Sequence, residues 1–144
     1  MFGVGTDREI LPELESKHPK YCPAMQYEWS VLNPPVSVSA AFRIHHRALS
    51  QHFHALTETL KAQPEQCRRW SQEVGEDLAK PGKLAHLMLK ASYVLNPDAI
   101  VLFSSKLPEH IQTNVAVSGD AGLETPARRL YDLIQRERPQ APAF

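Results

Sequence analysis

The sequence predicts an all-α protein: a compact bundle of four to five short helices, preceded by an extended, proline-rich N-terminal arm. Apolar residues recur at helical spacing from residue 39 onward, and prolines and glycines separate these stretches at short intervals. Five of the 12 prolines fall within residues 1–38, where no helical period survives. We therefore divide the chain into an arm (1–38), a helical domain (39–138) and a C-terminal tail (139–144).

Composition limits the functions that this chain can have. Its 144 residues correspond to about one domain, and 42% hydrophobic and 22% charged residues are ordinary values for a soluble protein. The formal net charge of zero argues against a strongly electrostatic nucleic-acid binder. No signal peptide is visible, and the longest apolar run, at residues 99–103, is too short to span a bilayer. Cys22 and Cys67 form no CxxC pair, so we expect a reduced, cytoplasmic protein without membrane contact.

The N-terminal arm is too apolar to be a solvated tail. Tyr27, Trp29 and Val31 alternate with polar residues, which is a strand-like pattern, whereas the surrounding prolines break any helix. We expect the arm to pack along the helical core and to expose aromatic side chains, which are favoured anchors of protein interfaces. The candidate partner-binding residues are Tyr21, Met25, Tyr27 and Trp29.

Residues 39–63 give the strongest helical pattern of the chain. Six residues recur at spacings of three and four and would form one stripe at ~100° per residue. Ser39 can serve as the N-cap, and Pro64 both ends this helix and suits the first position of the next. The stripe consists of Phe42, His46, Leu49, Phe53, Leu56 and Leu60.

Further helices follow at short intervals. The second covers residues 64–78 and ends before Pro81-Gly82, and the third covers 83–95 and is mostly apolar. A restart signal, Asn96-Pro97-Asp98, indicates a short buried helix at 97–106, although its AIVLF run could instead be a buried strand. We expect another short helix at 108–115, a loop at 118–124 and a last helix from 125 to 138.

The stretch RIHHRALSQHFH, residues 43–54, holds four of the seven histidines. On one helix, metal-ligating histidines sit three or four residues apart, whereas His45 and His52 are seven apart and His45 and His46 diverge. His46 falls within the apolar stripe, which is typical of a core histidine, and His54 faces outward. We therefore predict no metal site and no cofactor.

No catalytic constellation is visible, so we assign no catalytic residues. Cys67 lies on an apolar helix stripe beside Trp70, which indicates a small buried side chain rather than a nucleophile. No G-x-S-x-G motif is present, and the loop VSGDAG lacks the lysine and spacing of a phosphate-binding loop. An enzyme with a composite Cys/His site, drawn from distant segments, is retained as an alternative.

We therefore expect a non-catalytic helical subunit or adaptor that binds a protein partner, or a second copy of itself, in a larger cytosolic assembly. The alternative is a small helical subunit that contacts nucleic acid inside a nucleoprotein complex, where phosphate contacts would give salt-dependent affinity. Its candidate residues are Arg43, Arg47, His54, Arg68, Arg69, Lys83 and Lys90.

Overall fold

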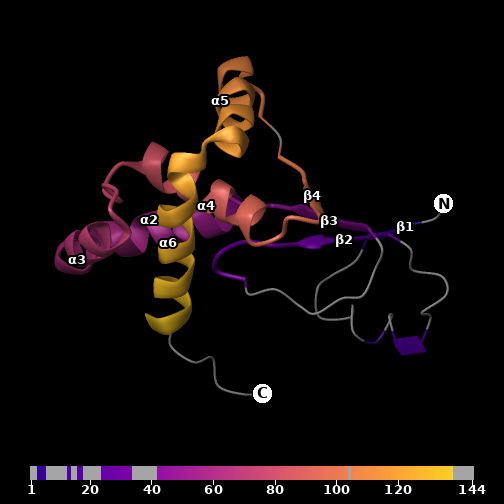
Figure 1. Ribbon diagram of the computed structural model, residues 1–144. Coiled ribbons are helices and arrows are strands. Elements are labelled where there is room, and N and C mark those ends of the chain that lie inside the picture. Colours follow the sequence, from indigo (N-terminus) through magenta and orange to yellow (C-terminus); the bar gives the residue numbers. More distant parts are fainter. Residues whose placement is uncertain are drawn as a thin grey trace.

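The computed structural model shows a mixed α/β fold, so the prediction of an all-α bundle is wrong. The structure describes residues 3–5, 13, 16, 17, 24–33, 42–103 and 105–137. Within these ranges, α-helices pack beside a small sheet of parallel strands (Figure 1). The predicted C-terminal tail and much of the predicted arm lie outside the described residues.

The sheet contains four parallel strands in the order β1-β2-β3-β4, so strands that follow one another in sequence are neighbours in space. The strands are β1 (Gly3–Gly5), β2 (Ala24–Glu28), β3 (Phe42–His46) and β4 (Ala99–Val101). In the register, Tyr27 lies beside His45, and His45 lies beside Val101. The strands β2 and β3 lie on either side of the predicted domain boundary at residue 38, and they pair directly.

Five α-helices make up most of the residues that the structure describes. They are α2 (Ser50–Ala62), α3 (Pro64–Val74), α4 (Pro81–Val94), α5 (Pro108–Gly119) and α6 (Glu124–Glu137), with a short 3-10 helix, η2 (Ala121–Leu123), before α6. The helices α3, α4 and α5 all begin at a proline, whose fixed φ suits the first helical position and whose missing N–H is not needed there. The predicted helix starts at Pro64 and Pro108 are confirmed, whereas α4 begins at Pro81, two residues before the predicted start at residue 83.

The first predicted helix, 39–63, is wrong over nearly half of its length. Phe42 to His46 form β3 between β2 and β4, and the helix starts only at Ser50. Side chains of FRIHH alternate between the two sheet faces, so the period-two pattern holds here, while the helical stripe is real for Phe53, Leu56 and Leu60 of α2. Pairing with two neighbouring strands overrides the local helical pattern.

The structure also differs from the prediction at residues 97–106. The predicted short buried helix is replaced by β4, which pairs with β3 in parallel. The strand reading of the AIVLF run is therefore the correct one, although Ile100 is 53% exposed rather than buried. Asn96 does not cap a helix here: its side chain donates to the carbonyl oxygen of Ser92 at 3.0 Å, at the end of α4.

The helix α4 lies at the centre of the core. It packs against α6, α2 and α5 and reaches β4, and seven of its 14 residues are buried. From α6, Ala127, Leu130, Leu133 and Ile134 face the same core. On the opposite flank, Arg69 and Trp70 of α3 both donate to the carboxylate of Glu137 at the end of α6 (2.7–2.9 Å).

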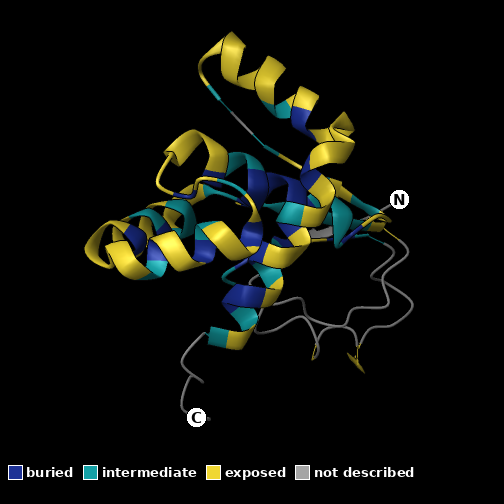
Figure 2. Ribbon diagram, turned by 60° about the vertical axis from the view of Figure 1, so that its left-hand side comes forward, coloured by how far each residue is buried: buried dark blue, intermediate teal, exposed yellow. Residues whose placement is uncertain are grey.

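The two faces of the sheet differ in their cover. Met25, Tyr27 and His45 on one face are almost completely buried, whereas Phe42 and Ile100 on the other are 47% and 53% exposed. The helix α5 is also poorly covered and is exposed along most of its length (Figure 2). Its last turn is held against α4, and the rest of the helix projects beyond the end of β4 (Figure 1). The molecule thus has a covered side, built on α4 and α6, and an open side, formed by β4 and α5.

Candidate interaction surface

The aromatic residues of the predicted arm lie inside the protein. Met25, Tyr27 and Trp29 are 0%, 2% and 1% exposed, so the expectation that the arm presents them to solvent is wrong. Trp29 stacks on Tyr131 of α6, with ring centroids 6.4 Å apart. The cause is the alternation in β2, which places every second side chain on the covered face. Tyr21 lies outside the described residues, and partner binding by this set stays a prediction that the packing does not favour.

The core histidine is His45 and not His46, which corrects the helical placement of this pair. His45 is 1% exposed and lies between Tyr27 (centroids 4.8 Å apart) and Trp29 (6.1 Å, with nearly parallel rings), whereas His46 is partly exposed. Neither ring nitrogen of His45 has a hydrogen-bond partner in the described part of the chain. Burial, followed by the charges of Arg43 and His46, lowers the pKa of His45 to about 4.

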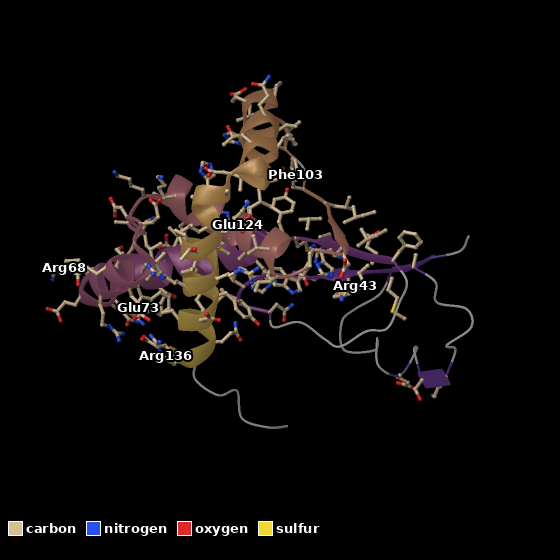
Figure 3. The ribbon with its side chains drawn as sticks, viewed as in Figure 1. Arg43, Arg68, Glu73, Phe103, Glu124 and Arg136 are labelled. Atoms are coloured by element: carbon tan, nitrogen blue, oxygen red, sulfur yellow. The ribbon has the colours of Figure 1, made fainter. Side chains whose placement is uncertain are left out.

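The basic residues predicted as a nucleic-acid surface are spread over several elements. Figure 3 shows Arg43 and Arg68 on opposite sides of the molecule, so the seven side chains do not form one patch. They are Arg43 on β3, Arg47 in the turn after it, His54 on α2, Arg68 and Arg69 on α3, and Lys83 and Lys90 on α4.

All of these residues except His54 lie within 4.0 Å of a carboxylate in the described chain, and Lys90 and Arg69 are held most closely. Lys90 is 2% exposed, and its ammonium donates to the carbonyl oxygen of Ser118 at 3.0 Å and lies 3.6 Å from the carboxylate of Glu124. Arg69 makes a two-pronged ion pair with Glu137. Lys90 therefore holds the end of α5 against α4 and has no access to a phosphate backbone.

A cluster that the sequence did not indicate lies where β2 and β3 end. The carboxylate of Glu28 is 2.7 Å from Nε2 of His52 and 3.5 Å from the guanidinium of Arg47. Arg47 and Ser50 have positive φ values of 58° and 37°, which non-glycine residues rarely adopt. These groups fix the sharp turn from β3 into α2. No glycine or asparagine marks the turn, so the sequence carried no signal for it.

The most exposed apolar side chains gather on the open side. Leu107, the N-cap residue just before α5, and Ile111 and Val115 within the helix are 47%, 43% and 57% exposed, and their spacing of four indicates one apolar stripe along α5. We call these three residues the α5 ridge. Ile100 and Leu102, 53% and 44% exposed, add apolar surface at the neighbouring end of β4. Sequence reasoning found the helix but missed the ridge, because periodicity does not show which way a stripe faces.

The described residues offer little support for a metal, thiol or membrane site. No group of three or more His, Cys, Asp or Glu side chains there could hold a metal ion. Cys67 is buried on α3, among the residues of the main core. Within the same ranges, every helix is too short or too polar to cross a membrane.

The fold and the surface define a class only in structural terms: a small α/β protein with a parallel sheet, one covered side and an exposed apolar helix. No protein-family model matches the sequence, and no curated protein is similar to it. Any statement about function therefore depends on the chemistry of the described residues.

Proposed function

We propose that this protein is a non-catalytic interaction subunit of a cytosolic assembly and that it binds its protein partner through the α5 ridge. The observation that carries this proposal is the exposure of three large apolar side chains on one stripe, from the N-cap to the middle of a helix that projects beyond the sheet (Figure 1). A solvated helix usually carries polar residues on its outer face. Apolar residues four apart are the pattern by which a helix occupies a hydrophobic groove of another protein.

The composition of α5 supports an apolar partner. The helix contains a single acidic residue, Glu109, in its first turn and no lysine or arginine. A partner protein that binds the ridge in one of its own grooves therefore has almost no charged side chain of α5 to desolvate. The end of α5 is held by the Lys90–Ser118 hydrogen bond, and Val117 is 4% exposed, so the ridge is presented on a fixed support.

The test compares two aspartate variants of α5 in the full chain. Ile111→Asp places a charge on the ridge, and Gln112→Asp places the same charge about 100° around the helix. We expect Ile111→Asp to lose the protein that the tagged wild-type chain captures from its native cells, and Gln112→Asp to retain it. Thermal melts and circular dichroism establish that both variants are folded. Equal recovery of that protein by all three chains would overturn the proposal.

A further inference from the structure

A continuous groove separates α5 from the body of the protein. It consists of two adjoining cavities of about 420 and 340 Å³, and Leu49 and Asn114 line both of them. The first cavity is lined by residues 46–50, at and after the end of β3, and by Leu102 and Phe103 just after β4. The second extends from there along the start of α4. Ligands of parallel sheets bind outside the carboxyl ends of the strands, and this groove begins there.

The charged side chains along the groove have one sign. Arg47 lines it together with His46, His86 and His110, and none of the described lining residues is an aspartate or a glutamate. The guanidinium of Arg47 is 3.5 Å from the carboxylate of Glu28, and the Arg47 side chain is 62% exposed. Such a long, solvated ion pair is weak, so Arg47 can also contact a bound anion.

Several polar groups in the groove are free to bind a ligand. The side chains of Ser50, His86, His110 and Asn114 make no hydrogen bond to the rest of the described chain. A serine, a histidine and an asparagine each carry an N–H or O–H that can donate to a carboxylate or phosphate oxygen. These donors come from three helices, so a ligand that they hold would connect α5 to α2 and α4.

Two helices also begin at the groove. Ser50 is the first residue of α2, and Pro81 and Gly82 are the first two of α4. Neither helix has an acidic residue in its first turn or a side-chain cap. The free N–H groups and the positive end of each helix dipole therefore add to the effect of Arg47.

The remaining walls of the groove are apolar. Leu49 and Phe53 contribute one wall, and Leu102 and Phe103 lie at the end nearest the sheet. Figure 3 shows Phe103 in the segment between β4 and α5. The two volumes fall within the range of about 300–1,000 Å³ that is usual for small-molecule sites.

We propose that this groove binds a small organic anion, with its carboxylate or phosphate head at Arg47 and Ser50 and its apolar body along Leu49 and Phe53. A bare inorganic anion would leave the apolar walls wet, and a neutral apolar molecule would leave the donors unused. The combination of a cationic end and apolar walls selects a ligand that has both parts.

The test uses nuclear magnetic resonance titration of the full-length chain with phenyl phosphate, phenylacetate, inorganic phosphate and benzyl alcohol. We expect one of the two aromatic anions to give saturable shifts at the amides of Ser50, Gly82 and Asn114. Inorganic phosphate and benzyl alcohol should each bind at least about tenfold more weakly, because each lacks one of the two parts. Comparison of the two aromatic anions identifies the preferred head group.

Two variants locate the site. Gly82→Leu adds bulk to the lining of the second cavity, and the added Cβ itself meets no atom within 4 Å, so the variant should fold normally and weaken binding about tenfold or more. Gly119→Leu is the matched control, because Gly119 has equally open surroundings at the end of α5 and lies outside the lining. Arg47→Asn removes the charge while tolerating the φ of 58°, and it should weaken binding about tenfold or more.

Three results would overturn the proposal. The first is that neither aromatic anion gives saturable shifts at the groove amides. The second is that benzyl alcohol binds as tightly as the anions, which would define an apolar pocket instead. The third is that Gly82→Leu binds like Gly119→Leu. Melting temperatures of all variants distinguish loss of the site from loss of the fold.

Discussion

The helices α4 and α5 follow one another in sequence, and both begin at a proline, yet they lie in opposite surroundings. Seven of the 14 residues of α4 are buried, whereas Val117 is the single buried residue among the 12 of α5. Apolar residues surround α4 on nearly every side, which requires a buried position, whereas α5 carries one apolar stripe and turns it outward. A helix that is apolar on most sides is therefore expected to be buried in its own protein. A single apolar stripe indicates only that some surface, of the same protein or of a partner, covers it.

Alanine substitutions in the two helices test this difference directly and should give the largest change in the free energy of unfolding. Leu87 of α4 is fully buried, so Leu87→Ala should lower the free energy of unfolding by about 2–5 kcal/mol. Ile111 of α5 is 43% exposed, so Ile111→Ala should change it by about 0.5 kcal/mol or less. Urea denaturation of the two variants measures both values. Similar losses of unfolding free energy in the two variants would show that α5, like α4, belongs to the core.

The covered side should also be the acid-sensitive side. The pKa of His45 is lowered from 6.5 to about 4 by burial and by the nearby Arg43 and His46. Between these two pH values, His45 is therefore protonated in the unfolded chain and neutral in the folded chain. The stability that depends on His45 is complete above about pH 6.5 and should fall by up to about 3 kcal/mol as the pH drops to about 4.

The variant His45→Phe isolates this contribution. Phenylalanine keeps the ring contacts with Tyr27 and Trp29 and removes two ring nitrogens that have no partner among the described residues. We expect its stability at pH 7.5 to equal or exceed that of the wild type, because no hydrogen bond is lost. Between pH 6.5 and 4, the variant should lose clearly less stability than the wild type. Parallel acid curves for the two chains would contradict the assignment.

The smallest expected effect concerns the junction between the two regions. Lys90→Met removes the hydrogen bond that ties the carbonyl of Ser118 to α4 and should cost about 1 kcal/mol, which corresponds to about fivefold faster amide hydrogen exchange in the last turn of α5. Glu124→Gln is the control, since its carboxylate is half exposed and 3.6 Å from Lys90, and it should cost less than about 0.5 kcal/mol. Unchanged exchange in Lys90→Met would mean that Val117 alone anchors α5.

The helices were predictable from the sequence to a greater extent than the sheet. Pro64 and Pro108 mark the starts of α3 and α5, and Pro81-Gly82 marks the boundary between α3 and α4; such signals are local. The strand β3 was not predictable in this way, because its conformation depends on pairing with β2 and β4. Residues 42–46 also fit a helical stripe, and only distant partners decide between the two patterns.

The candidate binding surfaces were harder to predict from the sequence than the helices. The apolar pattern of the arm predicts that Tyr27 and Trp29 need cover, and the protein itself covers them. The spacing of Leu107, Ile111 and Val115 could be read as a stripe, but the direction in which it faces depends on how α5 leaves the sheet. The groove depends on residues from β3, α2, α4 and α5, and their convergence arises only in the tertiary fold.

The pairing of β3 with β4 has a consequence for biosynthesis. Arg43 lies beside Ala99, and three helices separate the two strands in sequence. During translation, β3 cannot complete its pairing until β4 has left the ribosome, so one edge of β3 stays open while α2, α3 and α4 are made. Contacts of such long range also slow folding, and an unpaired strand edge favours aggregation. We therefore expect nascent chains that stop before residue 99 to depend on chaperones more than the full-length protein does.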